Sequence, residues 1–173
     1  MSGSYTIPLS GLKEGHHTFK FEIGNEFFEK FEESEVKEGS LITEIDIEKR
    51  SSHSDVKIRI SGSVRISCDR CLEMFLQPVN CENKLLVKFG KSLEDSDPDI
   101  LSIPSDEQEL DLQQHLYEFI HLALPIRRVH PDDKKGNSTC DPIMLKKLEE
   151  LIIDEDAESD PRWDELKRLM NDN

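Results

Sequence analysis

Apolar and polar residues alternate over much of the N-terminal half of the chain, a pattern typical of strands that bury one face. In one such stretch Phe19, Phe21 and Ile23 are separated by charged residues. Gly62 falls inside the longest alternation, and we expect it to shift the phase of the strand. The predicted strands cover residues 4–9, 18–22, 40–49, 56–61, 64–67 and 83–89.

Helical spacing of apolar residues appears in the C-terminal half. Apolar residues recur every three or four positions over residues 110–124, where Asp111 can cap the helix and Pro125 ends it. A second helix is predicted to begin at Asp141 and reach residue 151 or 152, and a short one to begin at Asp160.

These elements predict the fold class. Successive strands joined by short turns favour antiparallel pairing. We expect an α+β fold: a curved antiparallel sheet or partly closed barrel of about six strands, with one main packing helix and a helical acidic tail. The β-rich domain covers residues 1–139 with the main helix at 110–124, and the tail covers 140–173. Residues 91–108, rich in acids and with two prolines, predict a loop.

The charge of the chain is unevenly distributed. The 173 residues carry a net charge of -15, which repels a phosphate backbone and disfavours a general nucleic-acid coat protein. Residues 56–91 nevertheless hold seven bases against three acids, either a binding surface or a solvated strand face. No apolar run is long enough to span a bilayer, and no export segment is recognisable, so we expect a cytoplasmic protein.

Cys68 and Cys71 form the sharpest local motif, a CxxC pair that can supply two ligands to zinc. His130 and Cys140 are the other candidate ligands, but they lie in a polar stretch where they need not face the Cys68 turn. We therefore expect no cofactor, with zinc absent or weakly held. A redox pair and buried structural thiols are the alternatives.

Signs of catalysis are missing from the sequence. None of the six histidines lies in a recognisable motif, and no Gly-rich phosphate loop is present. We expect neither an enzyme nor a small-molecule substrate.

Several motifs together resemble the YceD family of large ribosomal RNA subunit accumulation proteins. They are Val64-x-x-x-Cys68-Asp69-Arg70-Cys71-Leu72, Phe75, residues 109–112, Leu122-Ala123-Leu124-Pro125 and Asp160-Pro161-Arg162-Trp163. The resemblance implies a bacterial, cytoplasmic, non-enzymatic factor needed for normal levels of large-subunit (23S) ribosomal RNA. Many relatives carry a second cysteine pair after the Leu-Pro, whereas this chain has Ile126 to Pro131 there, so a four-thiolate site is not carried over.

Two functional hypotheses follow. The chain acts on large-subunit ribosomal RNA through the basic segment and the CxxC turn, or it is an acidic adaptor that binds a basic ribosomal protein before assembly without touching RNA. The short tail helix docks either on its own domain or in the groove of a partner, with Trp163 as the buried anchor in the second case. The candidate binding residues are Arg59, Arg65, Cys68, Arg70, Cys71, Leu72 and Trp163.

Overall fold

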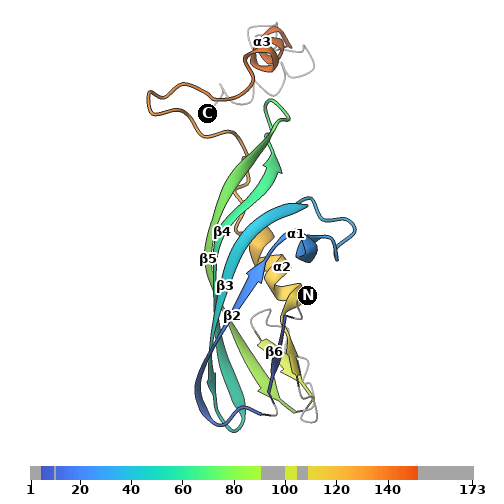
Figure 1. The fold of residues 1–173 in the computed structure, drawn as a ribbon, viewed down its shortest axis with the longest axis vertical. Coiled ribbons are helices and arrows are strands. Elements are labelled where there is room, and N and C mark those ends of the chain that lie inside the picture. The colour runs from blue at the N-terminus through green and yellow to red at the C-terminus, as the bar shows by residue number, and fades with distance from the viewer. Residues whose placement is uncertain (1–4, 10, 91–99, 105–108, 152–173) are drawn as a thin grey trace, which may run out of the picture.

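The computed structural model describes residues 5–9, 11–90, 100–104 and 109–151. These residues form an elongated α+β fold built on a strongly curved sheet (Figure 1). In chain order the elements are β1 (Thr6–Pro8), β2 (Gly15–Ile23), α1 (Asn25–Phe28), β3 (Glu38–Lys49), β4 (His53–Ser67), β5 (Met74–Phe89), β6 (Ile100–Ile103), β7 (Glu109–Asp111), α2 (Gln113–Leu122) and α3 (Pro142–Leu151).

Five strands form one mixed sheet in the order β2-β3-β4-β5-β6, and β1 pairs with β7 apart from it. Strands β2 to β5 are antiparallel neighbours, whereas β6 runs parallel to β5. The α+β class is confirmed, but the expectation of a purely antiparallel sheet is wrong. Ten residues separate β5 from β6, enough to carry the chain back beside Leu86 in a parallel direction. The sheet is not closed into a barrel, because β2 and β6 are its two edges.

The predicted alternation places one face of β3 and β4 in the core. Its buried residues on these strands are Leu41, Thr43, Ile45, Ile47, Val56, Ile58, Ile60, Val64 and Ile66. The predicted phase shift at Gly62 is wrong, because the pairing of β4 with β3 and β5 continues through Gly62 without a bulge. Ile60, Gly62 and Val64 therefore share one face of the strand.

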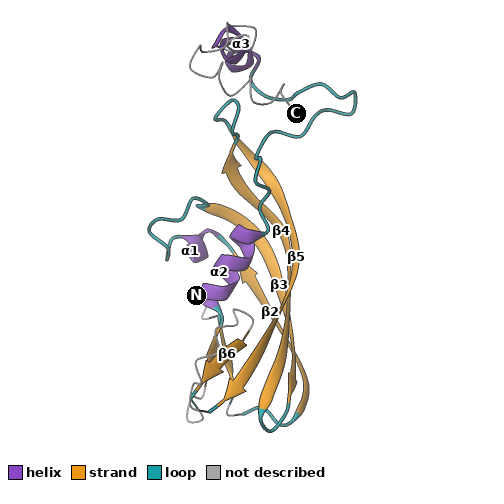
Figure 2. Cartoon of the chain, turned by 180° about the vertical axis from the view of Figure 1, so that it is seen from behind, coloured by secondary structure: helices purple, strands orange, loops and turns teal. Residues whose placement is uncertain are grey.

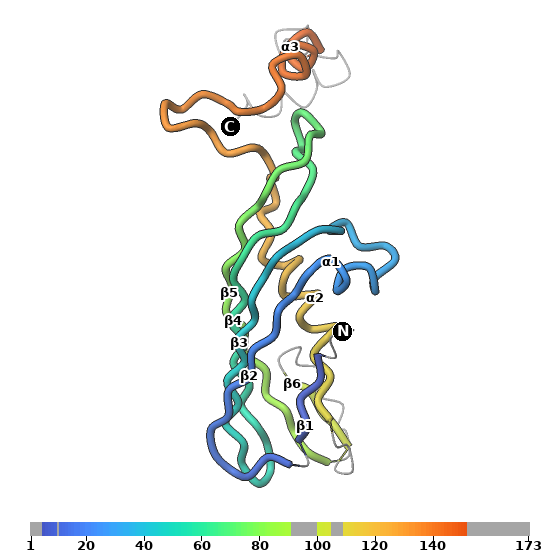
Figure 3. The backbone as a smooth tube through the Cα atoms, in the orientation of Figure 1, coloured from blue at the N-terminus to red at the C-terminus, as the bar shows by residue number. Residues whose placement is uncertain are grey.

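Helices α1 and α2 both lie on the concave face of the curved sheet (Figure 2). Phe27 and Phe28 of α1, and Leu116 and Ile120 of α2, are buried there. The pair of β1 and β7 lies on this side as well (Figure 3). The main helix begins later than predicted because residues 109–111 pair with β1.

Asp141 caps α3 as the sequence predicts, whereas the N-cap residue of α2 is Leu112 and not the predicted Asp111. Asp111 accepts a hydrogen bond from the backbone N–H of Gln113, with Oδ1 at 2.8 Å. Asp141 accepts one from the N–H of Ile143 at 3.0 Å, at the start of α3. The helix predicted to begin at Asp160 lies outside the described residues.

The β4–β5 hairpin extends well beyond the rest of the sheet, and the chain that leaves α2 runs along it (Figures 1 and 3). This chain, residues 123–141, then leads to α3 beyond the tip of the hairpin. In the part of the chain that the structure describes, no helix is long and apolar enough to cross a membrane.

Candidate metal centre

Three cysteines and one histidine meet at the tip of the β4–β5 hairpin. Cys68 and Cys71 come from the turn between the two strands, and His130 and Cys140 come from the chain that follows α2. The four possible ligand atoms all lie within 4.8 Å of one another. The three cysteine side chains are buried, and His130 is half-buried.

The turn that carries Cys68 and Cys71 is tightly closed. The backbone N–H of Leu72 donates to the carbonyl of Cys68 at 3.0 Å, and the N–H of Cys68 donates to the carbonyl of Glu73 at 2.9 Å. Leu72 adopts the left-handed backbone region, with φ of 62°, which is uncommon for a residue other than glycine. This conformation closes the turn, and the backbone N–H of Arg70 lies 3.5 Å from the Cys68 sulfur as a donor.

The segment that carries His130 and Cys140 is fixed to this turn. Asp69 donates its N–H to the carbonyl of Arg128 at 2.7 Å, and its carboxylate accepts the N–H of Arg128 at 2.6 Å. The Arg70 guanidinium donates to the hydroxyl of Ser138 at 3.0 Å. The His130 ring packs on Phe75, with ring centroids 4.8 Å apart.

Backbone donors converge on the sulfur of Cys68. Burial raises the pKa of this thiol, but N–H groups of Cys71, Arg70 and His130 point at the sulfur, and the pKa falls to about 6. Burial raises the pKa of the Cys71 thiol. Donors aimed at a buried sulfur favour the thiolate over the thiol, and the thiolate is the form that binds metals.

Three of the six distances between the ligand atoms match those of a tetrahedral site. With Zn–S bonds of about 2.3 Å and Zn–N bonds of about 2.0 Å, two sulfurs lie about 3.8 Å apart and a sulfur and a nitrogen about 3.6 Å apart. The Cys68 and Cys140 sulfurs are 3.7 Å apart. The His130 Nδ1 atom lies 3.4 Å from the Cys71 sulfur and 3.7 Å from the Cys140 sulfur.

The sequence-based argument against a metal site therefore fails. It rested on the expectation that His130 and Cys140 need not face the Cys68 turn, and the structure brings both against it. The polar segment 131–139 carries its own turn, in which the Asp133 carboxylate accepts backbone N–H groups of Lys135 and Asn137. This turn returns the chain so that the two ligands meet, and apolar periodicity gives no signal for it.

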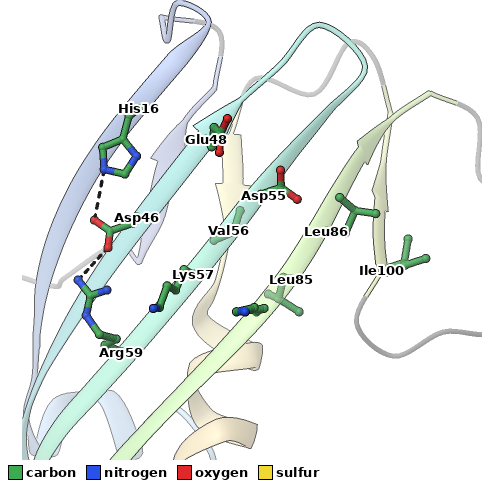
Figure 4. A pocket seen from close by; sticks show the side chains of 11 residues that line it. His16, Asp46, Glu48, Asp55, Val56, Lys57, Arg59, Leu85, Leu86 and Ile100 are labelled. Atoms are coloured by element: carbon green, nitrogen blue, oxygen red, sulfur yellow. Dashed lines mark ion pairs between the residues drawn. The ribbon is translucent and has the colours of Figure 1, made fainter.

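The arginines of the sheet are paired with acids. Arg59 lies 2.8 Å from Asp46 and 3.6 Å from Glu44, and Figure 4 shows Asp46 between Arg59 and His16. Arg65 lies 3.1 Å from Glu38. These acids belong to β3, so two of the seven bases counted along residues 56–91 are paired with acids of the neighbouring strand.

The face that carries these pairs also holds an open pocket of about 670 Å³, seen in Figure 4. The hydrogen bond from Thr18 and then the bond from Arg59, against some desolvation, lower the pKa of Asp46. Several of the charged side chains that line the pocket are therefore paired with one another.

The remaining candidate residues have different environments. The Arg70 side chain is half-buried, and its Nε atom is buried with no hydrogen-bond partner among the described residues. Leu72 is exposed, as are Met74 and Leu76 nearby on β5, an apolar surface that the sequence analysis missed. Trp163 lies outside the described residues.

A second feature missed from the sequence is the charge of the chain after α2. Residues 126–147 hold six Lys and Arg against three Asp, a net charge of +3 in a strongly acidic protein. Arg127, Lys134 and Lys135 are exposed there. Counting charge in this window of the sequence would have found it.

The comparisons with known proteins bear on this end of the molecule. A family model described as large ribosomal RNA subunit accumulation protein YceD matches residues 56–170. The match begins within β4 and includes β5 and all four residues of the cluster. The comparison with curated proteins and the comparison with solved structures each found no match.

Proposed function

Because the chain belongs to the YceD family of large ribosomal RNA subunit accumulation proteins, we propose that it is a non-enzymatic ribosome-biogenesis factor that supports accumulation of 23S ribosomal RNA. The family match over residues 56–170 is the observation that carries this proposal. The cytoplasmic location expected from the sequence is part of the same proposal.

We infer that RNA contacts the hairpin end of the molecule, through residues 126–147. Phosphate contacts need cations that are accessible and not already paired. Arg127, Lys134 and Lys135 are exposed and have no ion pair within the described ranges, whereas Arg59 and Arg65 are paired with acids of β3. We therefore propose the segment after α2, and not the sheet, as the surface that contacts RNA.

Two matched triple variants test this assignment, each removing three positive charges. The first replaces Arg127, Lys134 and Lys135 with alanine, and the control replaces Lys57, Arg59 and Arg65. If each residue of the first set contacts one phosphate, the slope of log affinity against log salt falls by about 3. We expect the control to keep most of its slope, measured by titrating a 23S ribosomal RNA transcript at several salt concentrations.

Complementation then links binding to function. Cells that lack the protein should recover their large-subunit ribosomal RNA with the wild type and with the sheet variant, but not with the segment variant. Equal loss in both variants would point to net charge alone, and loss confined to the sheet variant would restore Arg59 and Arg65 as the contact residues.

A second candidate function is the adaptor that binds a basic ribosomal protein. The observation that favours it is the exposed apolar surface of Leu72, Met74 and Leu76, which are 68%, 47% and 66% exposed. Aliphatic side chains offer no stacking platform for bases, but they suit a protein partner.

Pull-down from cell extract with and without nuclease separates the two functions. A nuclease-resistant partner that is lost in Leu76→Ser but retained in Ile42→Ser would support the adaptor, because Ile42 is also exposed but lies on β3. Loss of all captured material on nuclease treatment would support direct RNA binding.

A further inference from the structure

We propose that Cys68, Cys71, His130 and Cys140 bind one Zn²⁺ ion, and that this ion joins segment 126–140 to the β4–β5 hairpin. The proposal concerns the protein's own structure and does not depend on whether RNA or a protein is the partner.

The donor set selects the metal. Three thiolates and one imidazole are soft and borderline ligands that zinc accepts in closed tetrahedral sites, whereas Mg²⁺ and Ca²⁺ take oxygen ligands. Four protein ligands leave no open position for a substrate or for water, so this is a structural site. Three of the six separations between ligand atoms are 3.4 to 3.7 Å, which agrees with that geometry.

The surroundings of the sulfurs also suit a bound cation. The backbone N–H of Arg70 lies 3.5 Å from the Cys68 sulfur as a donor, and the three buried sulfurs lie within 4.8 Å of one another. Several buried thiolates would repel one another, and a divalent cation at their centre removes that repulsion.

Segment 126–140 buries little apolar area, so the ion would hold it on the hairpin in place of apolar packing. Most of this segment is exposed. Besides the cluster, its attachments to the rest of the fold include the Asp69–Arg128 and Arg70–Ser138 hydrogen bonds, the packing of the His130 ring on Phe75, the Arg128–Glu35 ion pair and the partly buried Val129. The long β4–β5 pairing does not involve the cluster and stands without it. Loss of zinc should therefore release the segment while the sheet stays folded.

The first experiment measures metal content by elemental analysis of the full chain, purified under reducing conditions without added metal. We expect about one zinc per chain in the wild type and less than about a tenth in Cys68→Ser and Cys140→Ser. Cys81→Ser is the matched control, because the Cys81 thiol lies outside the cluster and faces the carbonyl of Phe119. It should keep the full equivalent.

A second pair of variants distinguishes the loss of a ligand from misfolding as the cause of metal loss. His130→Ala should lose zinc, whereas His130→Cys, which restores a four-ligand site, should retain it. Cobalt added to the metal-free wild type should give the thiolate-to-metal absorption of a tetrahedral sulfur site, with band positions that change in His130→Cys.

Hydrogen exchange of the wild type with and without a chelator tests the structural role. We expect faster exchange of backbone amides in residues 68–73 and 126–140 after metal removal, with the paired amides of β3 and β4 unchanged. The proposal is overturned if the wild type contains no zinc and gives no cobalt spectrum, if Cys81→Ser loses as much metal as Cys68→Ser, or if removing bound zinc leaves exchange in residues 126–140 unchanged.

Discussion

Gly62→Ala should destabilise the protein by roughly 3 kcal/mol or more, a large part of the 5–15 kcal/mol typical of a domain. Gly62 lies in the central strand β4 with φ of +148°, a backbone conformation that side chains rarely adopt. An added Cβ would lie 2.3 Å from the carbonyl oxygen of Ser40 and 2.7 Å from the Cα of Leu41. Both obstacles are backbone atoms of β3, so the two strands would have to separate.

Thermal or urea unfolding of the wild type and the variant measures this effect, and Gly24→Ala is the control. An added Cβ at Gly24 meets no atom within 4 Å, and its φ of -112° is ordinary, so we expect a change within about 1 kcal/mol. Equal midpoints for Gly62→Ala and the wild type would contradict the close approach of β3 and β4 at this position.

The prediction from alternation worked best where one face of a strand meets the core. Leu41, Ile45 and Ile47 of β3 are buried as their spacing predicts. The pattern was misread at Gly62, because a glycine inside a strand suggests a bulge. Here its missing side chain instead allows a close approach of two strands while their register continues.

Strands β6 and β7 could not be predicted from the sequence. Each has only four or three residues, too few for a period of two to be recognised. Their pairing depends on partners distant in the sequence, because β7 pairs with β1 at the other end of the chain. Residues 110 and 111 were therefore predicted as the start of the main helix, although they belong to β7.

The cluster shows a different limit of sequence reasoning. Residue types and the CxxC spacing identified all four candidate ligands, but the spacing of His130 and Cys140 matches no common zinc motif. Their convergence depends on the path of segment 123–141 along the hairpin. That path is set by backbone contacts such as those between Asp69 and Arg128, which leave no trace in hydrophobic periodicity.

Phe28→Ala should cost about 3–5 kcal/mol, the usual loss for removing a fully buried phenylalanine side chain. Phe28 is 0% exposed and holds α1 on the sheet, with its ring edge-on to Phe27 at 5.3 Å between centroids. Its ring also sits over Gly39 of β3, where an added Cβ would lie 2.8 Å from Cε2. Phe31→Ala is the control, and we expect a smaller loss because Phe31 is only half-buried.

A double-mutant cycle with Gly39→Ala tests this contact directly. In the wild type Gly39→Ala should cost about 1–3 kcal/mol, because the new methyl group meets the Phe28 ring. In the Phe28→Ala background the ring is gone and the methyl group fills part of the space, so the cost should shrink or change sign. A coupling energy of about 0.5–3 kcal/mol between the two positions follows, measured by chemical unfolding of the four proteins. Additive effects would mean that Phe28 does not pack on Gly39, and that the orientation of α1 on the sheet is different.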